Sequence, residues 1–400
     1  MKENKTKPDI RFKGFTEAWE QRKLIDLCDY VDYRGKTPNK SDSGIFLVTA
    51  KNVKDGYIDY DVSKEYIPED KYEEVMRRGK PKIGDVLITT EAPCGNVAQV
   101  NKPNIALAQR IIKYRGHNQV IDNTYLKYYL LSPFFQNILN MKSSGGTVQG
   151  IKGSVLHQQK ISFTKYTEQL KIGQCLDSLD SLITLHQREC DQLKELKKSM
   201  LKKMFPRDES SIPEVRFAGF TDAWEQRKLR DEAIEILAGG DIDKEKTVEN
   251  GKYPIYANAL TNDGIVGYYD DYYRVTAPAV TVTGRGEVGY AKARMTHFTP
   301  VVRLLAVCSN HDCYFLENAI NNHKVVVEST GVPQLTVPQL SSYNIFFPAN
   351  DKEEVRIGKY FHTLDNLITL HQRNYNSLNR CKFSKITKNL LISHMVFIRK

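Results

Sequence analysis

The sequence predicts a mixed α+β fold: two tandem domains, each followed by a long helix, with the two helices pairing as an antiparallel coiled coil. Three observations support this prediction. Two segments of the chain occur twice, and each copy ends in a stretch with heptad spacing. The part of each copy between the repeated segments, here called its middle, holds β-branched runs bounded by glycine. At 400 residues the chain is also too long for one ordinary core, since a domain averages about 150 residues.

The duplication is the clearest feature of the sequence. Pro8 to Leu24 reads PDIRFKGFTEAWEQRKL and Pro213 to Leu229 reads PEVRFAGFTDAWEQRKL, with 13 of 17 positions identical. Leu179 to Arg188 reads LDSLITLHQR, and Leu364 to Arg373 repeats nine of these ten residues. The offset falls from 205 to 185, so the middles differ in length by 20 residues, and they share little sequence. A unit near 200 residues is too long for a solenoid repeat and indicates tandem domains.

The heptad stretches define the expected helices. Their apolar seam includes Leu176, Leu179, Ile183 and Leu193 in the first copy and Phe361, Leu364, Ile368 and Leu378 in the second. The 38 residues 168–205 would form a helix of about 57 Å. After residue 378 the spacing is lost, and residues 380–400 are basic with no acidic residue, which fits a divergent end, a phosphate-contacting tail or a frayed segment.

These signals give a complete division of the chain. The expected parts are a first domain at 8–165, its helix at 166–205, a linker at 206–212, a second domain at 213–350, its helix at 351–391 and a basic, apolar tail at 392–400. Within the middles, strands are expected at 44–49, 84–90 and 279–283, and a helix interrupted at Pro133 is expected over 123–139.

Composition narrows the classes of function. The chain carries 58 basic and 48 acidic residues, a net charge of +10, which favours a polyanionic partner. No apolar run reaches the roughly 20 residues of a membrane helix, and the N-terminus lacks the apolar core of a secretory signal. Seven cysteines without a CxxC pair predict neither a disulfide framework nor a zinc module. We therefore expect a cytoplasmic protein with no membrane partner.

No catalytic set stands out. Residues 145–152 resemble a phosphate loop, but Ile151 separates the glycine from the lysine. His186 and His371 lie on the coiled-coil seam, where packing is the simpler explanation. Cys308 and Cys313 flank His311 without a second ligand pair, so a metal site is not expected.

The repeated segments resemble those of the specificity subunits of type I restriction-modification systems. The resemblance covers nearly the whole chain and is carried by GFTEAWEQRKL and GFTDAWEQRKL, by residues 145–149 and 330–334, and by the LDSLITLHQR and LDNLITLHQR helices. The order of variable part, helix, variable part, helix is more specific than any one motif. It implies two target recognition domains and two spacer helices.

What the resemblance implies about function follows from this order. The chain would be a non-catalytic subunit that recognises an asymmetric bipartite target in double-stranded DNA. It would bind two methyltransferase subunits and, through the complex, the restriction and translocase subunits. The chain itself would bind no cofactor, while the partner subunits would use S-adenosylmethionine, ATP and Mg. A spacer of about 57 Å corresponds to roughly 17 base pairs of duplex.

Side chains that read bases are donors and acceptors presented from loops. The candidates are polar and basic residues near glycine or at strand ends, with a solvated basic loop as the alternative for each. In the first middle they are Tyr33, Arg34, Lys36, Thr37, Lys51, Asn52, Thr90 and Arg110. In the second they are Tyr256, Asn258, Thr283, Arg285 and Arg303.

Two other classes of protein stay open at this point. One is a free-standing coiled-coil DNA-binding or regulatory protein that has no methyltransferase partner and binds DNA strongly alone. The other is a self-contained nuclease or methyltransferase, against which the missing motifs weigh. The target bases themselves are not legible in the sequence.

Overall fold

The computed structural model describes residues 8, 10–33, 38–145, 149–207, 210–259, 261–323 and 333–382. It divides into two compact units, residues 1–186 with 374–400 and residues 187–373. Each unit therefore combines one α+β domain with a part of each long helix. Across the described ranges, no helix has the length and apolar character needed to cross a membrane.

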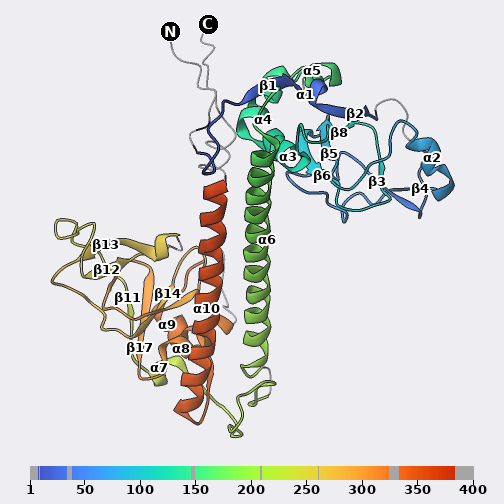
Figure 1. Cartoon of the computed structure of the whole chain (residues 1–400). Coiled ribbons are helices and arrows are strands. Elements are labelled where there is room, and N and C mark those ends of the chain that lie inside the picture. Colours follow the sequence, from blue (N-terminus) through green and yellow to red (C-terminus); the bar gives the residue numbers. More distant parts are fainter. Residues whose placement is uncertain are drawn as a thin grey trace. The chain divides into compact units, whose positions relative to one another are not determined.

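The described part of the first domain contains three small sheets, several strands of which are labelled in Figure 1. The four-stranded sheet has the antiparallel order β2 (Cys28–Asp32), β8 (Ile111–Gly116), β5 (Val86–Thr90), β6 (Cys94–Gln99). The three-stranded sheet has the order β4 (Tyr66–Ile67), β3 (Ile45–Val48), β7 (Ala106–Leu107), and β1 (Glu20–Lys23) pairs with β9 (Lys160–Phe163). The short helices are α1 (Leu24–Leu27), η1 (Glu69–Lys71), α2 (Tyr72–Val75), α3 (Asn123–Leu131), α4 (Pro133–Lys142) and α5 (Gly153–His157).

The second domain repeats this topology. Its four-stranded sheet has the order β11 (Ala233–Ala238), β17 (Leu304–Ser309), β14 (Ala279–Thr283), β15 (Ala291–Arg294). Its three-stranded sheet has the order β13 (Ile265–Tyr269), β12 (Tyr253–Tyr256), β16 (Thr299–Pro300), and β10 (Glu225–Lys228) pairs with β18 (Asn344–Phe347). The short helices are α7 (Leu229–Glu232), η2 (Thr261–Gly264), α8 (Cys313–Asn322) and α9 (Val337–Ser341).

The two middles therefore share one fold despite their different sequences. Their sheets match strand for strand, because buried sheet positions accept many β-branched and aromatic residues. One part of the longer first copy is the insertion of η1 and α2 between β4 and β5. The strands expected at 44–49, 84–90 and 279–283 are present as β3, β5 and β14.

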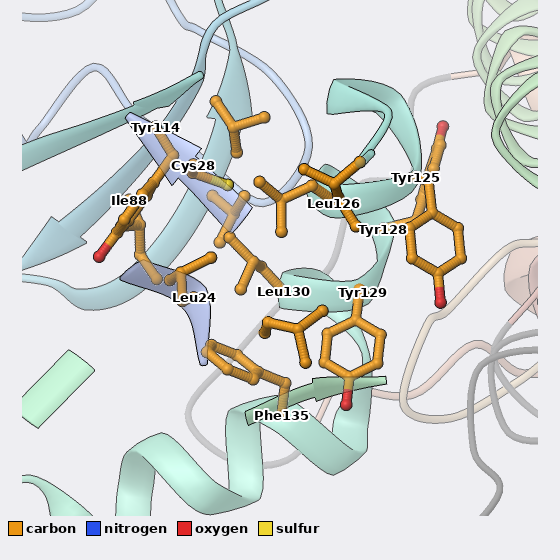
Figure 2. Close-up of a cluster of buried hydrophobic side chains, with 14 of the residues drawn as sticks. Leu24, Cys28, Ile88, Tyr114, Tyr125, Leu126, Tyr128, Tyr129, Leu130 and Phe135 are labelled. Carbon is orange, nitrogen blue, oxygen red and sulfur yellow. The ribbon is translucent and has the colours of Figure 1, made fainter. Parts of the chain in front are cut away.

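The core of the first domain lies where the four-stranded sheet meets α3 and α4 (Figure 2). The buried cluster includes Tyr125, Tyr129 and Phe135 from these helices. Ser132 separates the helices: its hydroxyl accepts a hydrogen bond from the amide of Phe135, and Pro133 occupies the first turn of α4, where proline fits a helix start. The predicted interruption at Pro133 is confirmed.

The repeated segments near residues 10–24 and 215–229 fasten each domain to its helix. Arg11 bonds the Glu168 carboxylate in the first turn of α6 (Tyr166–Lys203), with Nε–Oε1 at 3.0 Å. Arg216 makes the same bidentate contact with Glu353 in the first turn of α10 (Asp351–Arg380), at 2.8 and 2.7 Å. Both carboxylates are buried at 1% exposure. The strand that follows each arginine pairs with the strand that leads into the helix, and the intervening tryptophan is buried.

The long helices contact each other in antiparallel order. In the second unit Glu189 approaches His371 at 3.7 Å, Cys190 lies 3.4 Å from the side-chain oxygen of Gln372, and Lys197 bonds Asp365 at 2.6 Å. Residue numbers rise along α6 as they fall along α10, which establishes the direction (Figure 1). In the first unit Lys382 pairs with Asp180 of α6.

The predicted seam residues differ in how deeply their side chains are buried. Leu176, Phe361 and Leu364 are buried in the domain cores. Leu179 and Leu193 pack against the same cores from partly exposed positions, and Ile183, Ile368 and Leu378 are half-buried. The seam thus joins each helix to its domain as well as to the other helix. The expected continuation of the second helix beyond 382 and the tail at 392–400 lie outside the described residues.

Candidate nucleic-acid interface

Two strand ends gather six of the ten predicted DNA-binding residues that the structure describes. In the first domain, β5 ends at Thr90, next to Arg110, which immediately precedes β8. The Thr90 amide donates to the Arg110 carbonyl at 2.9 Å, and the Thr90 hydroxyl donates to the same oxygen at 3.2 Å. The Arg110 side chain is exposed and lies 3.6 Å from Glu91. Lys51 is also exposed, on the loop after β3. Arg34, Lys36 and Thr37 lie outside the described residues.

The second domain has the same arrangement at the end of β14. The Gly284 amide donates to the carbonyl of Arg303, the exposed residue before β17, at 2.9 Å. A Cβ atom on Gly284 would lie 2.4 Å from that oxygen, so only glycine allows this close approach. Arg285, the next residue, is half-buried and forms a β-bridge with Gln334.

Asn258 holds the Arg285 loop in place. Its side-chain oxygen accepts hydrogen bonds from the amides of Gly284, at 2.7 Å, and Arg285, at 3.2 Å. Its side-chain nitrogen donates to the Arg285 carbonyl at 2.5 Å. These three bonds occupy most of the capacity of the amide. We therefore interpret Asn258 as a positioning residue for the loop that presents Arg285.

Several predicted contact residues are buried and serve the fold instead. Asn52 is fully buried, accepting from Thr49 and donating to the carbonyls of Asp59 and Val62. The hydroxyls of Thr90 and Thr283 bond neighbouring backbone, and Thr283 accepts from the amide of Tyr290. A side chain that reads a base edge must be accessible at the surface. These buried groups are not, so we assign them a role in holding the loops.

Two aromatic candidates are also interior. Tyr33 donates its hydroxyl to the Gly79 carbonyl, and burial, followed by the nearby Asp85 charge, raises its pKa. Tyr256 lies 3.7 Å beneath the guanidinium of Arg294, and burial raises its pKa, partly offset by that arginine. Arg294 is itself buried and bonds Asp263 and Thr281, so its role is structural.

A pocket lies beside the Arg285 loop. It has a volume of about 170 Å³ and is lined by Ala257, Ala259, Asp263, Thr281, Thr283, Tyr290, Lys292, Arg294 and Leu304. Its walls come from the β14–β15 hairpin and the loop after β12. The exposed Arg303, the loop that Asn258 holds in place and this pocket give the second domain a surface suited to hydrogen-bonding partners.

His311 and Cys313, which the sequence analysis considered as metal ligands, have structural roles. Burial alone would lower the pKa of His311, but hydrogen bonds to Glu354 and Glu232 outweigh it and raise that pKa. The Cys313 thiol donates to the Ala279 carbonyl, and burial raises its pKa to about 12. Within the described parts of the chain, no group of three or more His, Cys, Asp or Glu side chains could hold a metal ion.

The comparison with known families matches both halves of this architecture. The family model of the type I restriction modification DNA specificity domain matches residues 16–195 and, a second time, residues 221–380. The chain belongs to this family. Each match spans one domain together with much of its long helix, so this specificity subunit carries two recognition domains.

Relatives of similar length support the assignment. A provisionally named type I specificity subunit of Mycoplasma pneumoniae is 27% identical over 83% of this chain and 85% of its own. A provisionally named specificity subunit of the MjaX type I restriction enzyme of Methanocaldococcus jannaschii is 23% identical over 96% and 95%. The crystal structure of a type I restriction-modification S subunit from M. genitalium superposes with a TM-score of 0.69, at 14% identity, covering 97% of this chain and 100% of that one. At that identity the structure supports the fold alone.

The structure also corrects the matching of two loop segments within this specificity subunit. The sequence aligns Gln149 with Gln334. In the structure, however, it is Gly150 that forms a β-bridge with Glu91, and Gln334 forms the equivalent β-bridge with Arg285. The residue after each bridge, Ile151 or Leu335, donates its amide to the equivalent strand-end carbonyl at 2.9 or 2.8 Å. The equivalence is therefore shifted by one residue, and it places Glu91, which sequence reasoning passed over, at the position of Arg285.

Proposed function

We propose that this specificity subunit reads an asymmetric, two-part target in double-stranded DNA. The main support is that one fold occurs twice with different residues at equivalent strand ends. Two different readers select two different half-sites, whereas two identical readers would select a palindrome. The net charge of +10 favours the phosphate backbone, which carries much of the affinity of DNA-binding proteins.

The chain would supply recognition and assembly, and the chemistry would reside in its partners. We infer two methyltransferase subunits using S-adenosylmethionine, and restriction subunits using ATP and Mg, with no cofactor bound by this chain. The absence of recognisable catalytic motifs in the sequence favours this division of labour.

A repeated pair of exposed leucines marks the surface on which we expect methyltransferase subunits to dock. Leu182 and Leu185 on α6 are 43% and 48% exposed. Leu367 and Leu370 occupy the same positions of the repeated segment on α10 and are 39% and 52% exposed. Residues three apart share a helix face, so each pair forms a small apolar patch. One patch per unit fits one partner copy per patch.

Replacing Leu182 and Leu185 together with serine is expected to remove one methyltransferase subunit from the complex. Burying a leucine against a partner contributes about 1.5–3 kcal/mol, and a hydroxyl side chain forfeits most of this. Native mass spectrometry of the co-expressed complex should show one methyltransferase copy in place of two. Lys194→Ala, exposed elsewhere on the same helix, is the control. Two copies retained by the double variant would place the docking surface elsewhere.

The helix pair would act as a spacer that sets the unread gap. The 38-residue helix α6 follows the first domain and precedes the linker to the second. Inserting four residues after Leu193, with a matching insertion after Ile368, should lengthen the pair by about 6 Å, or roughly two base pairs. The methylated motif should keep both half-sites and gain that gap. An unchanged gap would contradict the spacer role.

Selection from random-sequence duplexes distinguishes this function from a free-standing DNA-binding protein. The purified chain, alone and in complex with its methyltransferase subunit, is mixed with the pool at about 150 mM salt, where non-specific binding is weakened. We expect the complex to enrich one gapped motif. Tight, selective binding by the chain alone would favour the free-standing alternative, and a complex that enriches nothing would refute the proposal.

A further inference from the structure

The two domains place the same small substructure at one strand end. In the first, Thr90 bonds the Arg110 carbonyl, and Glu91 bridges Gly150. In the second, Gly284 bonds the Arg303 carbonyl, and Arg285 bridges Gln334. Sheet register confirms the match, because Thr89 pairs with Ile111 as Thr283 pairs with Leu304. Positions 110 and 303 are therefore equivalent, and so are positions 91 and 285.

The shared arginines have an unfavourable backbone conformation. Arg110 has φ +72° and Arg303 has φ +74°, in the left-handed region that the Cβ atom disfavours in residues other than glycine. Among the described non-glycine residues with positive φ, these two are the only arginines, and each directly precedes the equivalent strand, β8 or β17, of its four-stranded sheet. Glycine would adopt this conformation without strain. Both side chains are exposed, so core packing does not explain why arginine stands at both positions.

The neighbouring position differs in charge between the domains. Glu91 is 43% exposed and lies 3.6 Å from Arg110, which offsets its negative charge. Arg285 is half-buried, and Asn258 and Gln334 fix its backbone beside Arg303. The framework around the two positions is the same, while the side chain presented is an acceptor in one domain and a donor in the other.

We propose that each domain carries the same two-position DNA-reading site, in which a common arginine contacts phosphate and the adjacent residue reads one base. Arg110 and Arg303 are the common residues, and Glu91 and Arg285 are the specificity residues. The inference rests on the proposed function of DNA recognition. It adds Glu91, an acidic residue, to the determinants of the first half-site.

The assignment follows from what each residue can distinguish. A residue shared by two domains that read different half-sites cannot carry their difference, whereas phosphate is common to every sequence. A carboxylate accepts a hydrogen bond from the amino group of cytosine in the major groove. A guanidinium donates two to guanine. Glu91 therefore selects cytosine, and Arg285 selects guanine.

The test uses methylation of random duplex pools by the intact complex. With Glu91→Ala, cytosine preference at one position of one half-site should fall about tenfold, and the other half-site should be unchanged. With Glu91→Arg the preference should move to guanine. Arg110→Gly, which relieves the backbone strain, should keep the methylated motif unchanged. In binding titrations at several salt concentrations, it should weaken DNA binding about tenfold and reduce the slope of log K against log salt concentration by about one. Glu74→Ala, at an exposed site paired with Lys71, is the control.

Each outcome decides the proposal. An unaltered motif with Glu91→Ala overturns the role of position 91, and so does a folded complex with that variant that loses all binding, because one base contact carries only part of the affinity. A changed motif with Arg110→Gly overturns the phosphate role. If the wild-type complex selects no motif, the proposed function itself fails, which is a separate result.

Discussion

Replacing Arg285 with alanine should relax recognition of one half-site and leave the other intact. Asn258 and Gln334 hold the Arg285 backbone, so removing the side chain should not collapse the loop. The loss of one bidentate base contact amounts to about 1–3 kcal/mol, or roughly five- to 150-fold in discrimination. Sequencing the DNA methylated by the variant complex would show a degenerate position in one half only.

Two further variants separate the roles within this loop. Arg285→Lys keeps the positive charge but lacks the planar fork, so it should retain affinity and still lose discrimination. Asn258→Ala should weaken the same half-site indirectly, by loosening three hydrogen bonds to the loop. A wild-type motif from Arg285→Ala would remove this residue from the reading surface.

Removing the Glu353 carboxylate should destabilise the second unit strongly. Glu353 is 1% exposed and Arg216 10% exposed, and the two form a bidentate pair. Breaking a buried pair by removing one partner costs about 3–5 kcal/mol, because the remaining charge stays without compensation. Glu353→Ala should therefore lower the midpoint of urea unfolding followed by circular dichroism.

The chain offers a matched control for this prediction. Glu225 pairs with Arg227 at 2.7 Å on the surface, with the two side chains 64% and 39% exposed. Exposed pairs contribute within about 1 kcal/mol, so Glu225→Ala should shift the midpoint little. Equal shifts from the two variants would show that the buried pair does not fasten the domain to its helix.

The repeated framework was legible in the sequence because identical residues perform identical tasks in both copies. The arginine, the tryptophan and the EQRK strand recur, and the structure shows why: they join each domain to its helix. The common fold of the two middles could not be predicted from their residues. Its sheets depend on apolar character at alternating positions, which many different residues satisfy.

The sequence predicted only part of the candidate site. Arg110, Arg285 and Arg303 were identified from basic character near strand ends, and they lie at equivalent strand ends in the two domains. Asn52, Thr90 and Thr283 have the same local signature, yet they are buried and their side chains form hydrogen bonds with the backbone. Glu91 was missed because a carboxylate is unexpected beside DNA until its neighbour Arg110 is known.

Genome-wide adenine methylation is the most direct measurement of whether this chain is a two-part DNA reader. The chain is co-expressed with its methyltransferase subunit in a host that lacks adenine methylation, and the modified bases are mapped by sequencing. We predict a single motif with two dissimilar half-sites separated by an unread gap. A palindromic motif, a motif without a gap, or methylation that is independent of this chain would contradict the account.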